Sequence, residues 1–330
     1  MWTRPAPFTV VLCTFNGAKY LDEQLQSLRE QDGVAEIVAS DDGSTDDTLA
    51  ILHRHAAEDA RVRINRNSGR LGVTRNFEQA IQLARSPWIA LADQDDVWLP
   101  GKLARIRARW DGGAGLVHHA SRKFSGFHVP RQFAHWIGAG RKFSGSDWRR
   151  LLYRNTVVGH TTLFRADLAA RLAPFPPEIP HDWWLGAGAA LHGRVQFVNE
   201  CLVHYRIHST NAYHAAGSRV RRLQAEHTQR VALLQTLLRR HLLPPREAEF
   251  AEQYLALLRG SSPGVFPWRL WHFYRWHAAL FFGGPDYEPS FVTSQRKSWG
   301  AAVAAMLQAP VAAGEPAGLA VSEGSVPLND

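Results

Sequence analysis

Short apolar runs alternate with helical patterns through the first third of the chain. Four runs have the length and composition of strands: Phe8–Cys13, Glu36–Ser40, Arg61–Asn65 and Trp88–Ala92. Between them, apolar residues recur three or four positions apart, as at Leu21, Leu25 and Leu28, which predicts amphipathic helices. Strands and helices that alternate with a period of roughly 30 residues predict an α/β fold with a mostly parallel sheet and right-handed crossovers.

The middle of the chain continues this pattern less regularly. Leu116–His119, Val157–Arg165 and Val195–Tyr205 predict further strands, and Leu185–Leu191 predicts a helix of small residues. Ser121–Ser146 is basic, aromatic and glycine-containing without a clear period, so we expect a long loop there. Loops of this length in a compact domain are often functional.

The chain changes character after about residue 216. Arg219–Leu243 and Arg246–Leu258 have helical patterns without a cluster of reactive side chains, and Val265–Phe282 mixes aromatic residues with arginine and histidine. Gly300–Asp330 is rich in Ala, Gly, Pro and Ser, which predicts a disordered tail. We therefore expect an α/β domain at 1–215, a helical extension at 216–290 and a tail at 291–330.

Composition predicts a soluble protein of a reducing compartment, the cytoplasm. Hydrophobic residues make up 45% of the chain and charged residues 21%, and Cys13 and Cys201 lie in apolar runs typical of reduced core cysteines. The sequence has no uninterrupted apolar run of about 18 residues, so we expect no helix that spans a membrane. The net charge of +8 is compatible with nucleic acid, with anionic nucleotides or with an anionic membrane surface as a partner.

The strand predicted at Trp88–Ala92 runs directly into Asp93-Gln94-Asp95-Asp96. If the extended chain continues, Asp93 and Asp95 share a face, because alternate side chains of a strand point the same way. Two adjacent carboxylates repel one another unless a cation lies beside them, and Mg²⁺ or Mn²⁺ prefers carboxylate and phosphate oxygens. The alternative is an acidic turn that caps a helix at Pro100–Trp110.

Two other polar segments follow predicted strands. Thr14–Asn16 comes after the first strand and Asp41–Asp42 after the second. Ligands bind outside the carboxyl ends of parallel strands, so we expect these segments and Asp93–Asp96 to converge on one crevice. Asp41 and Asp42 can accept hydrogen bonds from a base or ribose hydroxyl, or can serve only as a turn and helix cap.

The second half of the chain adds a further set of candidates. Asp182 follows a proline-rich connector and precedes Trp183 and Trp184, so a raised pKa can make it a general base and the rings can stack on a sugar. The alternative is a helix N-terminal carboxylate beside core tryptophans. His208 is a candidate metal or diphosphate ligand, although a lone histidine is more often structural.

Arginines near glycines offer a different kind of contact. Arg70 and Arg75 lie close to Gly69 and Gly72 and can meet phosphate or base edges, whereas a solvated arginine is the ordinary alternative. The sequence has neither a Gly-x-Gly-x-x-Gly nor a Gly-x4-Gly-Lys-Ser/Thr motif, which disfavours a dinucleotide-binding or P-loop protein. It also has no Cys/His cluster with zinc spacing.

Taken in order, these stretches resemble the inverting family 2 glycosyltransferases, which have the GT-A fold. Val10–Gly17 is similar to the family's opening strand and Thr-Tyr-Asn turn, with Phe15 in place of the usual tyrosine. Asp41–Asp46 resembles the nucleotide-binding Asp-Asp-Gly-Ser turn, and Asp93–Asp96 resembles the Asp-x-Asp metal motif. His181–Trp184 lies where the family has its catalytic base, here with His181 in place of the first acid.

Two weaker similarities extend this one, and the whole resemblance covers about residues 7–211. Tyr205–His208 is similar to a C-terminal Tyr-Arg-x-His of many members. Gly72–Phe77, Asp93–Pro100 and His181–Trp184 together are most similar to the bacterial rhamnosyltransferase-like subgroup. The resemblance implies a Rossmann-like, mostly parallel sheet flanked by helices for the catalytic domain at 1–215.

The resemblance also implies a reaction and its participants. A nucleotide-diphosphate sugar, dTDP- or UDP-linked, would donate a rhamnose-like sugar with inversion to a hydroxyl of a glycan or lipid-linked glycan, in bacterial surface polysaccharide synthesis. Asp182 would be the base, and Asp93, Asp95 and His208 would hold Mg²⁺ or Mn²⁺. The nucleotide and sugar would contact Thr14, Phe15, Asn16, Asp41, Asp42, Arg75, Asp93, Trp183 and Trp184.

Other classes stay open at this point. A nucleotide-sugar fold without activity would keep the binding residues, but Asp95 and Asp182 together argue for an enzyme. A nucleic-acid binder is disfavoured by the acidic strand ends, and a sugar nucleotidyltransferase by the absence of a glycine-rich basic loop after the first strand. The mixture of rings and cations at Val265–Phe282 is typical of an interfacial helix, so we expect peripheral contact with the inner membrane face, unless these rings are core.

Overall fold

The computed structural model describes residues 7–126, 142–208, 219–260, 266–282, 297, 298 and 302. One eight-stranded sheet has the order β3-β2-β1-β4-β7-β6-β8-β5. Its strands are β1 Phe8–Thr14, β2 Val34–Asp41, β3 Val62–Arg66, β4 Trp88–Asp93, β5 Val97–Trp98, β6 Leu116–Phe124, β7 Thr162–Arg165 and β8 Val195–Arg206. The helices beside it are α1 Ala18–Arg29, α2 Thr48–Glu58, α3 Val73–Gln82, α4 Lys102–Arg109, α5 Ala166–Leu172 and α6 His181–Leu191.

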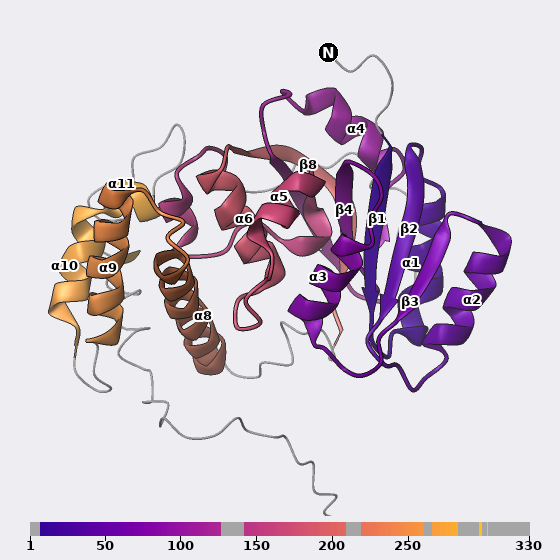
Figure 1. The fold of residues 1–330 in the computed structure, drawn as a ribbon, viewed down its shortest axis with the longest axis horizontal. Coiled ribbons are helices and arrows are strands. Elements are labelled where there is room, and N and C mark those ends of the chain that lie inside the picture. Colours follow the sequence, from indigo (N-terminus) through magenta and orange to yellow (C-terminus); the bar gives the residue numbers. More distant parts are fainter. Residues whose placement is uncertain are drawn as a thin grey trace, which may run out of the picture.

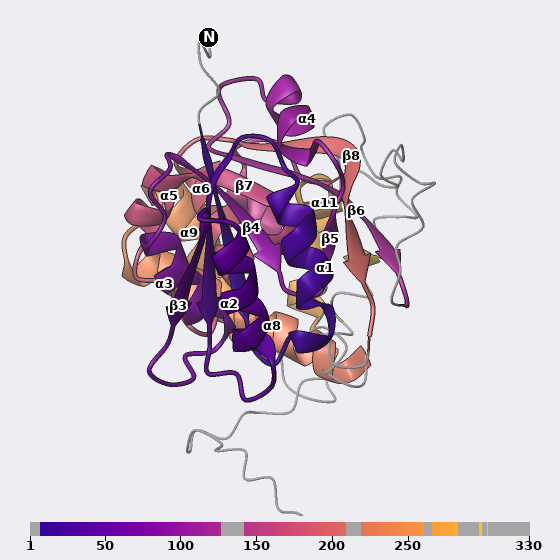
Figure 2. The same cartoon turned by 90° about the vertical axis from the view of Figure 1, so that its right-hand side faces the viewer.

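The half of the sheet built from β1 to β4 is parallel, as the alternation of strands and helices predicts. Successive buried residues of β1 point to opposite faces. Val10 and Leu12 pack with the apolar faces of α1, α2 and α4, whereas Val11 packs with residues of α3, α5 and α6. Helices therefore cover both faces, and Figure 2 views the molecule from the α2 end, with α1 and α2 side by side.

The other half of the sheet is mixed in direction. β7 pairs antiparallel with β4 and β6, and β6 pairs in parallel with β8. The predicted loop at Ser121–Ser146 is wrong at its start, because β6 continues to Phe124 by pairing with β8. The strand predicted at Val157–Arg165 is also shorter, since Gly159–Thr161 forms a 3-10 turn before β7. Residues 127–141 of the predicted loop lie outside the described residues.

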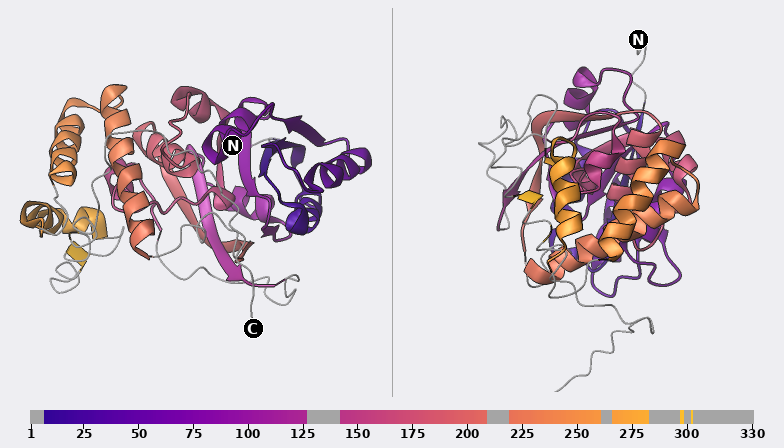
Figure 3. Two further views of the ribbon diagram at one scale, coloured as in Figure 1. Left: turned by 90° about the horizontal axis from the view of Figure 1, so that it is seen from below. Right: turned by 90° about the vertical axis from the view of Figure 1, so that its left-hand side faces the viewer.

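Four C-terminal helices pack on the α6 side of the sheet: α8 Arg219–Arg239, α9 Pro245–Arg259, α10 Trp268–Trp276 and α11 Ala278–Phe282. Figures 1 and 3 show them gathered at the end of the molecule opposite α2 and β3. Their buried residues, among them Leu233, Tyr254 and Tyr274, belong to the same hydrophobic cluster as Trp183 of α6. The extension therefore shares its core with the sheet domain.

Some predicted segments cannot be compared with the structure. The boundary at 215/216 and nearly all of the tail at 291–330 lie outside the described residues. Among the described residues, no helix is both long and apolar enough to cross a membrane.

Candidate active site

The turns that follow β1 and β2 interlock through hydrogen bonds. The backbone N–H of Asn16 donates to Ser44 Oγ at 2.9 Å, and Asn16 Oδ1 accepts the N–H of Thr45 at 2.9 Å. The N–H of Gly17 donates to Thr48 Oγ1 at 2.8 Å. Asn16 has φ 48°, in the left-handed region that asparagine tolerates better than most residues. The predicted convergence of these two turns is thus present.

Asp41 and Asp42 are both buried and are hydrogen-bonded within the protein. Asp41 accepts hydrogen bonds from Thr14 Oγ1 at 3.0 Å and from the N–H and hydroxyl of Ser44. Asp42 accepts hydrogen bonds from Asn67 Nδ2 and from the N–H groups of Leu71 and Gly72 at 2.7–2.9 Å. These carboxylates build the turns, which is the structural alternative that the sequence left open.

Gln94 connects the β4 turn to the β1 turn. Its side-chain oxygen accepts the N–H of Phe15 at 2.8 Å, and its amide donates to the carbonyl of Phe15 at 3.1 Å. A Cβ atom at Gly17 would lie 2.2 Å from the same Gln94 oxygen, so a larger residue there would displace the Gln94 side chain from Phe15. Arg70 lies over the Phe15 ring at 4.0 Å, which places an arginine and an aromatic ring together at the crevice.

The acidic segment turns instead of continuing as a strand. β4 ends at Asp93, and the chain reverses at Gln94 and Asp95. This turn brings Asp93 and Asp96 beside His160, with Nδ1 of the imidazole 3.5 Å from Asp93 Oδ2 and 3.4 Å from Asp96 Oδ2. The prediction that Asp93 and Asp95 share a strand face is therefore wrong. The Asp95 carboxylate instead meets His208, 2.7 Å from Nε2.

Burial and mutual repulsion perturb these carboxyl groups. Burial raises the pKa of Asp96 to about 8, and the charges of Asp93 and Asp95 push it in the same direction. Burial and the charge of Asp93 also raise the pKa of Asp95, against the opposing effect of His208. For Asp93, burial is outweighed by the hydrogen bond and charge of His160, so its pKa is lowered.

Two buried basic side chains lie beside the acidic turn. Lys102, the first residue of α4, is fully buried, donates to the carbonyl of His160 at 3.1 Å and lies 3.4 Å from the centre of the Trp98 ring. Burial lowers the pKa of Lys102 well below its ordinary value. Arg206, also fully buried, donates from Nε to the carbonyl of Asp95 at 2.9 Å and pairs with Glu23.

The chemistry of this cluster fits a hard divalent cation. Asp93, Asp96 and His160 each offer one ligand atom, and these atoms lie within 4.8 Å of one another. Asp96 Oδ2 and His160 Nε2 are buried and have no hydrogen-bond partner within the described part of the chain. An orphaned carboxylate oxygen beside other carboxylates is stabilised by a cation. The Asp95–His208 pair lies next to this cluster and brings the predicted ligands Asp95 and His208 together.

Asp182 lies at the N-terminus of α6, partly exposed. Its Oδ1 accepts hydrogen bonds from Asn155 Nδ2 at 3.0 Å and from the N–H of Trp183 at 2.7 Å, and its Oδ2 accepts one from the N–H of Gly159 at 3.0 Å. Desolvation raises the pKa of Asp182, although the His181 imidazole and the N–H donors oppose it. Gly159 precedes His160 in the chain, and the charge of Asp93 acts on Asp182, so the carboxylate lies within electrostatic range of the acidic cluster.

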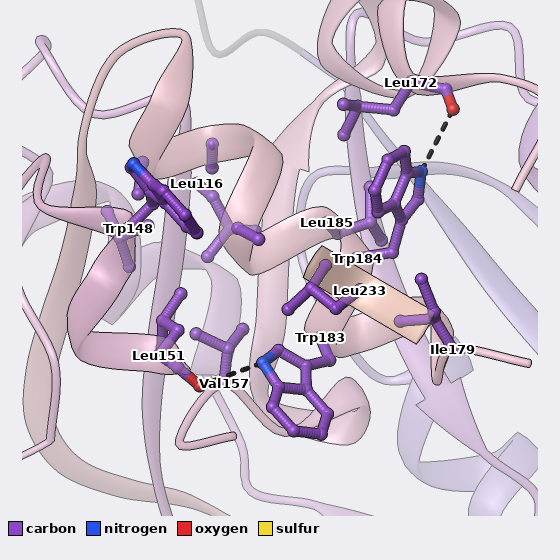
Figure 4. Close-up of a cluster of buried hydrophobic side chains, with 14 of the residues drawn as sticks. Leu116, Trp148, Leu151, Val157, Leu172, Ile179, Trp183, Trp184, Leu185 and Leu233 are labelled. Atoms are coloured by element: carbon purple, nitrogen blue, oxygen red, sulfur yellow. Dashed lines mark hydrogen bonds between the residues drawn. The ribbon is translucent and has the colours of Figure 1, made fainter. Parts of the chain in front are cut away.

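Trp183 and Trp184 do not line the crevice. The rings are 2% and 0% exposed, and their indole N–H groups donate to the carbonyls of Leu151 and Leu172, both at 3.0 Å. Figure 4 shows the two rings directed into the apolar cluster around Leu185 and Leu233. The prediction that they stack on a sugar is wrong, because no face of either ring is open. From Trp183 to Ala190, α6 has no polar side chain and is buried as a core helix.

Arg75 is held by its own helix. Its guanidinium pairs with Glu78 one turn along α3 at 2.7 Å, and the side chain is 39% exposed. The structure thus shows an intrahelical ion pair at this position, and a contact of Arg75 with nucleotide stays a prediction.

Several residues of the site escaped the sequence interpretation. His160 lies in the run predicted as a strand, Val157–Arg165, and Asn155 lies two residues before it. Lys102 lies in a predicted helix as one basic residue among many. Asp96 gave a visible signal as the third acid of the segment, but its partner could be recognised only when the 3-10 turn at Gly159–Thr161 placed His160 beside it. Gln94 gave no signal beyond its position between two acids.

Comparison with known proteins agrees with this architecture. Residues 9–172 match the model of glycosyl transferase family 2. The chain belongs to this family. An uncharacterized protein of Mycobacterium bovis is 26% identical over 223 residues, which cover 63% of this chain and 61% of the relative. The chain thus spans about three fifths of the length of that relative. The succinoglycan biosynthesis protein ExoU of Rhizobium meliloti is 31% identical over 111 residues, 32% of each chain.

Solved structures confirm the GT-A fold. Residues 1–349 of the S. aureus protein TarS, in a complex with UDP-GlcNAc, superimpose with a TM-score of 0.57 at 18% identity, over 91% of this chain and 81% of that fragment. The mannosyltransferase PcManGT of Pyrobaculum calidifontis, bound to GDP-Man and Mn²⁺, gives 0.55 at 22% identity, over 92% and 88% of the two chains. These similarities extend beyond residue 172 to most of the chain.

Proposed function

We propose that this protein transfers a sugar from a nucleotide-diphosphate sugar to a hydroxyl of a glycan or lipid-linked glycan. The observation that carries the proposal is the placement of the partly exposed Asp182 carboxylate beside the Asp93–Asp96–His160 cluster. The Asp182 carboxylate can accept a proton, and the cluster can neutralise a diphosphate through a bound cation. The family and the succinoglycan relative support a role in bacterial surface polysaccharide synthesis.

Asp182 is the general base in this proposal. Oδ1 accepts two hydrogen bonds and Oδ2 one, so Oδ2 keeps a lone pair for the proton of the acceptor hydroxyl. The deprotonated acceptor oxygen attacks the anomeric carbon as the bond to the diphosphate breaks. A single displacement without a covalent intermediate inverts the anomeric configuration.

Donor binding is assigned to the turns after β1, β2 and β4. Arg70 and Phe15 offer flat surfaces for a base, and Thr14, Asn16 and Asp42 hold the turns beside them through hydrogen bonds. Asp93, Asp95, Asp96, His160 and His208 are the residues that would hold Mg²⁺ or Mn²⁺. The cation, when bound, acts as a Lewis acid that offsets charge on the leaving diphosphate. A rhamnose-like sugar on dTDP or UDP is the donor that we propose.

The test is a screen of nucleotide sugars, with Mn²⁺ or Mg²⁺, for donor hydrolysis and transfer. We expect Asp182→Asn to keep donor affinity and to lose about 10²–10⁴-fold in transfer rate, the usual contribution of a general base. Near-normal turnover of this variant with saturating donor would place the base elsewhere. A protein that binds a nucleoside diphosphate but turns over no donor would instead be a binding module.

We also propose that α10 lies against an anionic inner membrane surface. Leu270 and Tyr274 face the core, whereas Trp268 and Trp276 are 55% and 88% exposed, and α10 carries Arg269 and Arg275 without an acidic residue. Exposed tryptophans with cations are typical of an interfacial helix. The alternative interpretation is that the aromatic residues of Val265–Phe282 belong to the core. It holds for Phe281 and Phe282 of α11, which are buried.

Flotation with vesicles decides the membrane proposal. Intact protein should float with anionic vesicles at low salt and dissociate at high salt, whereas the double variant Trp268→Ser, Trp276→Ser should stay at the bottom. If both proteins stay at the bottom, α10 has no lipid contact.

A further inference from the structure

One arginine connects the C-terminal helices to the backbone beside the active site. Arg230 of α8 is 9% exposed, and its guanidinium donates to the carbonyl of Leu152 and, at 2.7 Å, to that of Tyr153. Both carbonyls belong to the segment 152–158, which is neither helix nor strand. Buried carbonyls outside regular structure need external donors, and a guanidinium can serve two at once.

The other end of the segment 152–158 is hydrogen-bonded to Asp182. Asn155 Nδ2 donates to Asp182 Oδ1, and the Asn155 amide is itself oriented because its oxygen accepts the N–H of Val157 at 3.0 Å. The N–H of Gly159 donates to Asp182 Oδ2. At the start of the segment, the Leu151 carbonyl accepts the indole N–H of Trp183, as Figure 4 shows. Arg230 and Asp182 thus bind two ends of one short stretch of backbone.

Close packing leaves this stretch little freedom where it meets the carboxylate. A Cβ atom at Gly159 would lie 2.9 Å from His181 Nε2 and 3.9 Å from Asp182 Cβ. The His181 ring is in turn stacked on Phe77, with ring centres 3.9 Å apart. A small shift of the segment therefore has to displace the Gly159 N–H or the Asn155 amide relative to Asp182.

We propose that Arg230 is a positioning residue for Asp182, so that α8 sets the orientation of the catalytic carboxylate through the segment 152–158. This inference rests on the proposed role of Asp182 as general base. It gives the C-terminal helices a part in the reaction although none of their described residues touches Asp182. Loss of Arg230 frees the Leu152 and Tyr153 carbonyls, the segment relaxes, and Asn155 and Gly159 no longer hold both carboxylate oxygens.

The chain offers a matched control at the end of the same helix. Arg240 donates to the carbonyl of Pro174 at 2.7 Å and to that of Leu172 at 3.3 Å, and lies over the Trp184 ring at 5.3 Å. It therefore satisfies two carbonyls of the same domain, but neither carbonyl belongs to the segment 152–158, whose Asn155 donates to the Asp182 carboxylate. Arg230→Met and Arg240→Met remove the same kind of interaction from two places.

The experiment compares these two full-length variants with the wild type. Urea unfolding measures stability, and steady-state kinetics measure donor KM, transfer kcat and the pH dependence of kcat. We expect similar stability losses and an unchanged donor KM in both variants. Only Arg230→Met should lose kcat, by about 10-fold or more, because small misplacements of a catalytic group are costly. Arg230→Lys should recover part of the lost kcat.

The pH profile separates positioning from a general loss of structure. Asp182 works only as the carboxylate, so kcat falls as the pH falls through its pKa. Loss of the Asn155 and Gly159 hydrogen bonds should move this acid limb to higher pH. His181 and Asp93, the charged or titratable groups that act on Asp182, are unchanged in both arginine variants. Arg240→Met should keep the wild-type limb.

Equal kcat values per folded enzyme in the two methionine variants, or an unmoved acid limb in Arg230→Met, would overturn the positioning role. If Arg230→Met does not fold, Asn155→Ala tests the same connection from its other end and should show the same loss of kcat and shift of the limb. A wild-type protein that transfers no sugar from any donor would contradict the proposed function instead, before the variants are compared.

Discussion

Two groups of aspartates lie at the ends of the parallel strands β2 and β4, which flank β1, and their surroundings are opposite in kind. Asp41 and Asp42, after β2, accept hydrogen bonds from hydroxyl, amide and backbone N–H donors of the protein itself. Asp93, Asp95 and Asp96, at the end of β4, lie beside two histidines, and one oxygen of Asp96 accepts no hydrogen bond from the described residues.

This difference shows that adjacent acids do not by themselves indicate a metal site. What matters is whether the fold supplies enough donors for the carboxylate oxygens. A group that is fully hydrogen-bonded is part of the scaffold, whereas a group that lacks donors gains from a cation. The four predictions below test this distinction, from the largest expected effect to the smallest.

Removal of the Asp42 carboxylate should strongly destabilise the protein. Asp42→Ala leaves the N–H groups of Leu71 and Gly72 without their acceptor, and hydrogen bonds to a charged group contribute about 1.5–3 kcal/mol each. We expect the free energy of unfolding in urea to fall by about 3 kcal/mol. Asp47→Ala is the control, because Asp47 in the same turn is exposed and makes no side-chain cap hydrogen bond. Equal losses in the two variants would contradict a scaffold role for Asp42.

Removal of the Asp95 carboxylate should instead affect ligand binding. We expect Asp95→Ala to fold with nearly wild-type stability and to lose about 10-fold or more in Mn²⁺-dependent affinity for a nucleoside diphosphate, about 1.4 kcal/mol. Calorimetry with and without Mn²⁺ measures this loss. If Asp95→Ala binds the nucleoside diphosphate with unchanged affinity in the presence of Mn²⁺, Asp95 is not a ligand of the cation.

Gln94 connects the turn after β4 to the turn after β1, which is itself hydrogen-bonded to the turn after β2. Its removal should therefore have a smaller effect that several turns share. Gln94→Ala loses two hydrogen bonds to Phe15, for which we expect about 1 kcal/mol. Gly17→Ala should be destabilised by the contact with the Gln94 side chain and should be partly rescued when combined with Gln94→Ala. A double-mutant cycle in urea measures this coupling, and strict additivity would show that the two turns are independent.

The smallest change is expected for Asp96→Asn in the absence of divalent ions. The pKa of Asp96 is about 8 in the folded protein and its ordinary value is 3.8, so the folded state binds the proton more tightly. Stability without metal should therefore fall as the pH rises between these two values. Asp96→Asn should flatten this dependence and raise stability at pH 6, where folding of the wild type takes up a proton at Asp96. Thermal unfolding in EDTA across pH 5–8 measures the pH dependence and the stability at pH 6. A steeper fall of stability with pH in the variant would contradict the assignment of this dependence to Asp96.

The sequence by itself determined the parallel half of the sheet and the place of the crevice. Apolar runs of strand length and helical spacing are local signals, and the carboxyl ends of parallel strands must meet at one edge. Thr14–Asn16, Asp41–Asp42 and Asp93–Asp96 were predicted to converge for that reason, and β1, β2 and β4 bring them together.

Only the tertiary structure decided what each of these residues contacts. The reversal at Gln94–Asp95 joined Asp96 to His160, and the irregular segment before β7 brought Asn155 and Gly159 to Asp182. The burial of Trp183 and Trp184 depended on the C-terminal helices, whose Leu233 and Tyr254 complete the same core. Such contacts join residues far apart in the chain, so no local period or motif records them.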